Sequence, residues 1–387
     1  MNMTGMMKLM WVLAAVLGLM TTNIHAQDLQ QPRIEVCFVL DTTGSMSGLI
    51  EGAKQKIWSM AGDMLRAKPT PAVKIALLGY RDRGDQYVTQ WFDLTDDIDA
   101  MYAQLMEFKA DGGGDGPESV NQALHEAVTK ISWSKDKSVY KVIFLVGDAP
   151  PHMDYKNDVQ YMQSCELAVK SDIIINTVQC GSDGQTTTVW NRIAKLAEGS
   201  FAAIDAGGGM QVVATPVDDE LAKLQGALAG TVVAYGDARQ QKEVSSKLSS
   251  AAMADKAINA DRMLYMFSAS ESTPASAAAP SMVVSGRGDL VRDVAEGKVE
   301  LSGLKPEELP AELQKLDAPA RAKYLEEQAG KRKVLQNQVE ELTKQRQEFI
   351  DAELAKQAAE GKGDGFDSKV REMVRSQAAV KGMKWEE

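Results

Sequence analysis

A carboxylate and two hydroxyl groups follow directly on an apolar run near the start of the chain. Asp41, Thr43 and Ser45 stand at alternate positions after Ile34–Leu40, and Gly44 between them lets the backbone turn sharply. Oxygen donors of this kind suit hard divalent cations. The pattern therefore predicts a cation site on a short loop, with Mg²⁺ as the expected ion and Mn²⁺ or Ca²⁺ as alternatives for the same donors.

A second carboxylate reaches a comparable position later in the chain. Asp148 ends the run Val142–Gly147, whose near-continuous apolar character is typical of a strand covered on both faces. If the two strands are parallel neighbours, Asp41 and Asp148 lie on the edge where open α/β sheets bind ligands. The alternative is that each aspartate merely caps the turn or helix that follows it.

The elements that must position these residues alternate between strands and helices. Strands are expected at 34–40, 73–80, 87–92, 139–146, 173–179 and 201–204. Helices are expected at 47–67, 96–109, 117–131, 158–170, 188–197 and 218–228. This order predicts an α/β fold with a doubly wound, mostly parallel sheet, and places 87–92 at an edge.

These residues carry a resemblance to the von Willebrand factor type A (VWA) domain, over roughly residues 34–230. The metal-ion-dependent adhesion site of that family has the pattern Asp-x-Ser/Thr-x-Ser, which is matched by Asp41-x-Thr43-x-Ser45. The resemblance implies that both hydroxyls bind the metal and that Asp41 acts largely through water. It also implies that Asp148 completes the shell and that one coordination position stays open for a carboxylate of a protein partner.

The third loop departs from the common family pattern, in which a threonine follows a glycine pair. The chain has Asp-Gly-Gly-Gly-Asp-Gly-Pro-Glu at 111–118, so Asp115 is the natural replacement as a metal ligand. Alternatively, Pro117 begins a helix and Asp115 complements its N-terminus. With Asp41 and Asp148, Asp115 would surround the ion with three negative charges. Such a site should attract an acidic partner less than a threonine-containing site would.

The same loop and the segment 80–85 resemble an exported bacterial subgroup of the family. Arg81 and Asp82 follow the second expected strand, and His152 follows Asp148, so all three are candidates for partner contact. For His152 the competing interpretation is a turn histidine near the surface, and for Arg81 and Asp82 it is an ion pair beside the metal loops.

The N-terminus predicts export. Lys8 is the only charged side chain before Asp28, and the apolar stretch Leu9–Met20 is too short to span a bilayer as a permanent helix. Ala26 supplies a small residue for cleavage, so residues 1–26 resemble a secretory signal peptide. The expected product is periplasmic or secreted and does not span the membrane after the signal is removed. The alternative is an uncleaved anchor.

Charge and cysteine content exclude several classes of protein. The formal charge of −11 becomes −12 once the +1 of Lys8 is removed with the signal. This acidity argues against binding to nucleic acid or to an anionic membrane surface. Three cysteines are too few for a disulfide scaffold, although a bond between Cys165 and Cys180 is left open.

The rest of the chain divides into two regions. Residues 231–304 contain a helical stretch at 238–267 and a Ser/Ala/Pro-rich linker at 268–281. Residues 305–387 are charged and helix-forming, with a long helix expected at 318–360 and a final helix at 367–381. The long helix has a partial heptad-like stripe. It predicts either a hairpin that packs on itself or on the α/β domain, or a coiled coil that joins copies of the chain.

The function that this sequence predicts is an exported, metal-dependent protein-binding module, with C-terminal helices for positioning or assembly. An enzyme is not expected, because neither a nucleophile–base pair nor a Gly-Lys-Ser/Thr phosphate loop is recognisable. Two alternatives stay open: a metal-assisted hydrolase, and a structural scaffold that binds through its C-terminal helices.

Overall fold

The computed structural model describes residues 31–385 except 115, 211, 271–278, 281 and 361–364. The predicted signal peptide, Asp115 and most of the predicted linker at 268–281 therefore lie outside the described residues. Pro32–Glu387 form one unit by their internal contacts.

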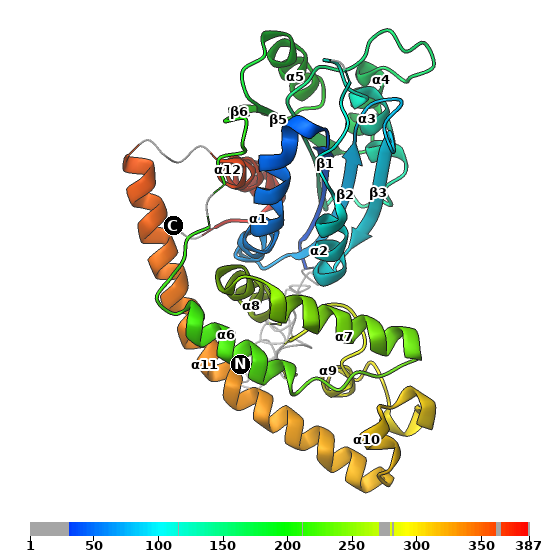
Figure 1. Cartoon of the computed structure of the whole chain (residues 1–387), viewed down its shortest axis with the longest axis vertical. Coiled ribbons are helices and arrows are strands. Elements are labelled where there is room, and N and C mark those ends of the chain that lie inside the picture. The colour runs from blue at the N-terminus through cyan, green and yellow to red at the C-terminus, as the bar shows by residue number, and fades with distance from the viewer. Residues whose placement is uncertain are drawn as a thin grey trace, which may run out of the picture. The chain divides into compact units, whose positions relative to one another are not determined.

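Six strands form a single sheet in the order β3-β2-β1-β4-β5-β6 (Figure 1). Their bounds are β1 (Arg33–Asp41), β2 (Ala72–Tyr80), β3 (Thr89–Thr95), β4 (Tyr140–Gly147), β5 (Ile173–Cys180) and β6 (Phe201–Ile204). Every neighbouring pair is parallel except β2 and β3. The predicted mostly parallel sheet with an irregular edge strand is thus confirmed, and β1 and β4 are adjacent.

Helices cover both faces of the sheet because β1 directs alternate apolar side chains to opposite sides. Val36, Phe38 and Leu40 belong to the core beneath α1 (Ser47–Leu65), α2 (Ile98–Glu107) and α12 (Phe366–Ala378). Cys37 and Val39 belong to the core beneath α3 (Val120–Thr129), α4 (Tyr161–Lys170) and α5 (Gly184–Leu196).

Helix α3 begins three residues later than expected. Pro117 is not its first residue, since Ser119 is the N-cap and the helix starts at Val120. The reason is that Glu118 pairs with the segment after β4: its amide donates to the Pro150 carbonyl at 2.9 Å, and the His152 amide donates to its carbonyl at 3.0 Å. This pairing keeps the end of the third loop extended.

A second group of helices packs beside α1. It comprises α6 (Asp218–Ala229), α7 (Ala238–Met253), α8 (Lys256–Ser270), α9 (Leu290–Ala295), α10 (Ala311–Gln314) and α11 (Ala318–Ala359). Short 3₁₀ turns occur at η1 (Gly44–Met46), η2 (Leu301–Gly303), η3 (Pro306–Glu308) and η4 (Ala379–Lys381). Val233 and Tyr235 pack within this second group, in a core that includes Leu290 and Leu325, and they do not form a named strand.

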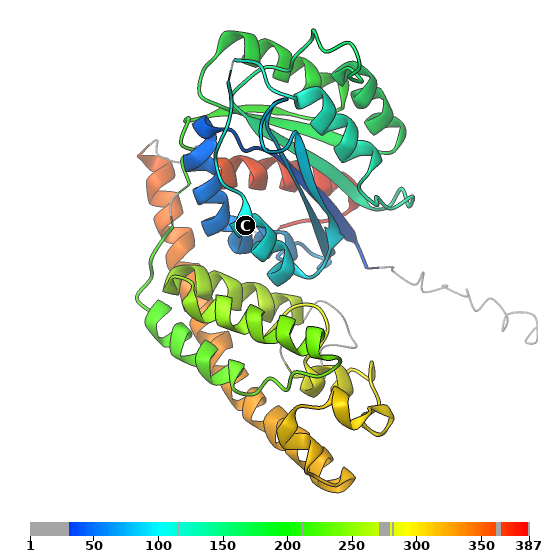
Figure 2. The same cartoon turned by 45° about the vertical axis from the view of Figure 1, so that its right-hand side comes forward.

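The long helix predicted at 318–360 is confirmed as α11, which lies along α6, α8 and α9 of the same chain (Figure 2). Its apolar residues Leu325 and Val339 are buried in those contacts. Arg332 and Arg346 of α11 are also buried, in ion pairs with Asp289 and with Asp218 and Asp261. Much of the partial heptad-like stripe therefore packs against other helices of the same chain. A homo-oligomeric coiled coil stays a prediction.

The final helix returns to the α/β domain. Phe366 packs edge-on against Phe38 of β1 with ring centroids 6.1 Å apart, and Gln377 of α12 exchanges hydrogen bonds with Asn176 of β5. The final helix α12 thus packs on the α/β domain, which is one of the alternatives predicted for the C-terminal helices.

All three cysteines are free and buried. Cys165 and Cys180 belong to cores on opposite faces of the sheet, so the bond left open between them does not form. Among the helices of the described segments, none combines the length and apolarity needed to cross a membrane.

Candidate metal-binding site

Asp41 is the last residue of β1 and is fully buried. One of its carboxylate oxygens, Oδ1, accepts hydrogen bonds from the amide and hydroxyl of Thr43 at 2.9 and 2.6 Å. Within the described part of the chain, the other oxygen, Oδ2, has no hydrogen-bond partner. A buried acceptor left in this state is costly and calls for a ligand or an ordered water.

The surroundings of Asp41 also disfavour its ionised form. Burial raises the pKa of this carboxyl to about 7, and the hydrogen bonds from Thr43 oppose the rise only in part. The nearby carboxylate of Asp148 raises the pKa of Asp41 further. A cation in contact with this group, or one water away, would favour its ionised form.

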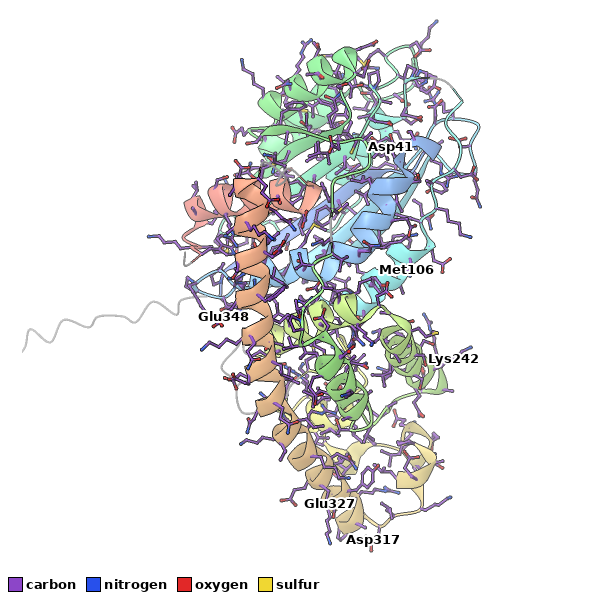
Figure 3. The ribbon with its side chains drawn as sticks, turned by 60° about the vertical axis from the view of Figure 1, so that its left-hand side comes forward. Asp41, Met106, Lys242, Asp317, Glu327 and Glu348 are labelled. Atoms are coloured by element: carbon purple, nitrogen blue, oxygen red, sulfur yellow. The ribbon has the colours of Figure 1, made fainter. Side chains whose placement is uncertain are left out.

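The two predicted hydroxyls lie beside this carboxylate. The Thr43 and Ser45 oxygens are 3.4 Å apart, with Thr43 buried and Ser45 exposed. The Gly44 amide donates to the Gly112 carbonyl at 3.2 Å, which joins the first loop to the third. The register of the sheet brings Asp41 and Asp148 to the same edge, on which Figure 3 labels Asp41.

Gly147 leaves room for the side chains of Asp41 and Tyr80. A Cβ atom at this position would lie 2.5 Å from the Tyr80 hydroxyl oxygen and 3.0 Å from Asp41 Oδ2. Both distances are too short, so any larger residue would displace Asp41 or Tyr80. The sequence showed this glycine only as the end of an apolar run.

A pocket of about 430 Å³ opens in front of these residues. Thr43, Ser45 and Asp148 line it together with residues that we did not single out as ligands. These are Gly44, Gly112, Gly113, Gly116, Pro117, Glu118, Ala149, Pro150, Asp183 and Gln185. The sequence signals for Glu118 and Asp183 were weak: one ends the unusual third loop, and the other is the N-cap of α5.

The donor set fits a hard divalent cation. Thr43, Ser45, Asp41 and Asp148 offer only oxygen, which suits Mg²⁺, Mn²⁺ or Ca²⁺. Across the described segments, no three His, Cys, Asp or Glu side chains converge in a group that could hold a metal ion. A metal at this edge would therefore depend on the two hydroxyls as well as on Asp41 and Asp148.

The three residues considered for partner contact lie beneath the surface. Arg81, Asp82 and His152 are 2%, 7% and 7% exposed. Arg81 Nε donates to the Thr42 carbonyl at 3.1 Å and so braces the first loop. His152 Nε2 lies 3.4 Å from Asp82 Oδ2, and the two residues lie under the loops. In the isolated chain they present almost no surface to a partner.

Asp82 ties two of those loops together. Its carboxylate accepts hydrogen bonds from the Ser119 hydroxyl and the Tyr155 hydroxyl, both at 2.8 Å. The Tyr155 ring stacks on His152 with centroids 4.1 Å apart. The cluster therefore supports the loops around the pocket from below.

Comparison with known proteins identifies the part of the chain that carries this site. Residues 35–213 match the family model described as von Willebrand factor A domain. Von Willebrand factor A domain-containing protein 7 is 35% identical over 120 residues in Homo sapiens and 33% identical over 120 residues in Rattus norvegicus. Each match covers 31% of this chain and only 12% of the relative's length.

Two solved structures of low sequence identity are similar to about half of this chain. Proximal thread matrix protein 1 from the mussel byssus, with a zinc occupied MIDAS motif, is 16% identical and has a TM-score of 0.37. That match covers 46% of this chain and 42% of the mussel protein. The SpRpn10 VWA domain is 12% identical with a TM-score of 0.35, and the match covers 50% of this chain and 95% of that domain.

Proposed function

We propose that the chain is a metal-dependent protein-binding module, on the basis of the match of residues 35–213 to the von Willebrand factor A domain model. The observation that carries this proposal is the buried Oδ2 of Asp41, which has no partner among the described residues and sits behind two hydroxyls. A divalent cation, with Mg²⁺ as the first candidate, would supply the missing positive charge. It would also present an open coordination position to a protein partner.

Each residue has a distinct role in this proposal. Thr43 and Ser45 bind the ion directly through their hydroxyls, because both residues line the pocket. Asp41 and Asp148 orient the ion's water ligands from behind. Asp115 is a further proposed ligand. Arg81 holds the first loop in place through the Thr42 carbonyl.

Binding is favoured over catalysis by the position of His152. A metal-assisted hydrolase needs a proton carrier within reach of the metal-bound water. His152 is buried against Asp82, and it is not among the residues that line the pocket. We therefore propose a binding role and keep the hydrolase as the alternative.

The C-terminal helices are proposed to position the domain. Arg262 of α8 and Lys247 of α7 form ion pairs with Asp99 and Asp97 at the start of α2, so the helices are tied to the α/β domain. A scaffold that binds only through residues 305–387 is less favoured, because α12 contributes side chains to the core of the sheet.

Thermal unfolding tests the metal site. The unfolding temperature of the chain from Gln27 onward is measured at increasing concentrations of Mg²⁺, Mn²⁺ or Ca²⁺. The same measurement is made on Asp41→Ala and on Glu166→Ala, an exposed control. Saturable stabilisation is expected for the parent and the control, reaching about 2.7 kcal/mol at a hundred times Kd. Asp41→Ala should not respond. If none of the three cations stabilised the parent protein, the proposal would be refuted.

Export is proposed on the basis of residues 1–26 and needs its own test. The full chain is expressed in a bacterium, the cell is fractionated, and the N-terminus of the product is sequenced. The expected product starts near Gln27 and is found outside the cytoplasm. An intact N-terminus on a cytoplasmic product would contradict this proposal.

A further inference from the structure

A second pocket opens where the helical group meets the α/β domain. It has a volume of about 210 Å³ and lies among four helices, α1 and α2 of the α/β domain and α7 and α8 of the helical group (Figure 1). It shares no lining residue with the pocket in front of Asp41. We call it the helical pocket.

The wall of the helical pocket is aromatic and apolar. Trp58 of α1 and Ile258 of α8 are buried in it, and the Tyr102 ring on α2 lies 5.6 Å from the Trp58 ring between centroids. Small side chains complete much of the lining: Ala100, Ala103, Ser246, Ser250, Ala251 and Ala254. Three of these, Ala103, Ser246 and Ser250, are exposed, so the pocket is open to solvent. An aromatic ring packs well against such a wall.

One polar group of the helical pocket lacks a partner. Asn259 of α8 lines the pocket and is 4% exposed. Its Oδ1 atom accepts no hydrogen bond in the segments that the structure describes. A buried amide oxygen in this state is stabilised by any donor that reaches it. The pocket therefore favours a molecule that carries a hydrogen-bond donor.

The charged residues of the helical pocket are already paired. Arg262 donates to both carboxylate oxygens of Asp99, at 2.7 and 2.9 Å. Lys247 pairs with Glu243 at 3.1 Å and with Asp97. The charged lining residues are two acids and two bases: Asp99, Glu243, Lys247 and Arg262. An ion entering the pocket would lose hydration without gaining a free counter-charge, so an uncharged molecule is favoured.

The volume of the helical pocket limits the size of its ligand. An apolar cavity of roughly 150 Å³ holds benzene. At about 210 Å³, the helical pocket has room for one ring or for two fused rings. Drug-sized molecules occupy larger pockets, typically of about 300–1,000 Å³.

We infer that the helical pocket binds a small, uncharged aromatic molecule whose N–H or O–H group donates a hydrogen bond to Oδ1 of Asn259. The rings of this molecule lie against Trp58 and Tyr102. The site is separate from the proposed metal site, and the inference does not depend on metal binding.

Three related probes test the inference. Indole has two fused rings and an N–H donor, benzothiophene has sulfur in place of the N–H, and indole carboxylate adds a negative charge. Isothermal titration calorimetry measures their binding to the chain from Gln27 in the presence of a chelator. Indole should bind about threefold to tenfold more tightly than benzothiophene, the usual contribution of one neutral hydrogen bond. It should also bind more tightly than the carboxylate. No binding of indole, or equal or tighter binding of either other probe, would overturn the inference.

Asn259→Leu removes the acceptor and keeps a branched side chain of similar shape. This variant should bind indole and benzothiophene equally well, because the donor of indole no longer has a partner. Asn191→Leu, an exposed change on α5, is the matched control and should keep the preference for indole. If Asn259→Leu also kept that preference, Asn259 would not be the acceptor and the inference would be wrong.

Ala254→Leu locates the probe without touching a buried polar group. Ala254 lines the helical pocket at the C-terminal end of α7 and is only partly buried, so the variant should fold. The larger side chain narrows the pocket and should weaken indole by about tenfold or more. Ala252→Leu, an exposed change on the same helix, is the control and should have no effect. Unchanged affinity in Ala254→Leu would place indole elsewhere and overturn the inference.

Discussion

The guanidinium of Arg262 donates two hydrogen bonds to the carboxylate of Asp99, at 2.7 and 2.9 Å. Both side chains are buried, and Arg262 also donates to the Val283 carbonyl at 2.9 Å. The pair joins α8 of the helical group to the first turn of α2 in the α/β domain. The C-terminal half of the chain is therefore attached to the α/β domain through buried charge as well as apolar contact.

Removing Arg262 should be strongly destabilising. Arg262→Ala leaves the Asp99 carboxylate buried without its cation, and the loss of one partner of a buried pair typically costs about 3–5 kcal/mol. Urea denaturation measures the free energy of unfolding. Lys170→Ala breaks the exposed pair with Glu166 on α4 and should cost at most about 1 kcal/mol. Similar losses in the two variants would contradict this view of the interface.

Gly147→Ala should damage both stability and cation binding. The added Cβ would meet the Tyr80 hydroxyl and Asp41, so these side chains must shift, at a cost of about 1–3 kcal/mol. Gly62→Ala is the control, because nothing lies within 4 Å of its added Cβ and it sits inside α1. There alanine should stabilise the helix by up to about 1 kcal/mol. Denaturation with and without Mg²⁺ measures both effects, and equal behaviour of the variants would refute the steric argument.

The parts of the site that could be predicted from the sequence are those at strand ends. Asp41 and Asp148 each end a buried strand, and parallel pairing of β1 with β4 brings such ends together. Glu118 and Asp183 could not be found in the same way. Their convergence on the pocket depends on loop geometry, such as the hydrogen bond between the Glu118 amide and the Pro150 carbonyl.

The packing of the C-terminal helices could not be predicted from the sequence for a similar reason. An apolar stripe predicts that a helix is covered, but it does not say by what. Phe366 packs against Phe38, although the two residues are far apart in the sequence. Arg332 is buried, although arginine is usually exposed. Such pairings belong to the tertiary structure and leave little local signal in the sequence.

The contribution of Asp41 to the stability of the metal-free protein should rise as pH falls. Burial raises the pKa of Asp41 from 3.8 to about 7, so the folded state holds a proton that the unfolded state releases between these values. The stability that this proton confers is complete below pH 3.8 and is lost as pH rises through about 7. Asp41→Asn should remove this contribution.

Denaturation in the presence of a chelator, at pH 5 and at pH 8, measures this contribution of Asp41 to the free energy of unfolding. The parent should lose more stability than Asp41→Asn between these two values, and the variant should be the more stable protein at pH 8. If the two proteins changed in parallel, Asp41 would not be the group responsible.

Phe366→Ala should show that the final helix α12 belongs to the core of the α/β domain. Phe366 is 1% exposed and packs with residues of β1 and α1, so truncation leaves a cavity that should cost about 3–5 kcal/mol. Phe349→Ala is the matched control, because Phe349 on α11 is 41% exposed. Its loss should cost well under half as much, since little apolar surface is uncovered. Urea denaturation compares the two. If Phe366→Ala were no worse than the control, α12 would not contribute to the folded domain, and residues 305–387 would behave as a separate region.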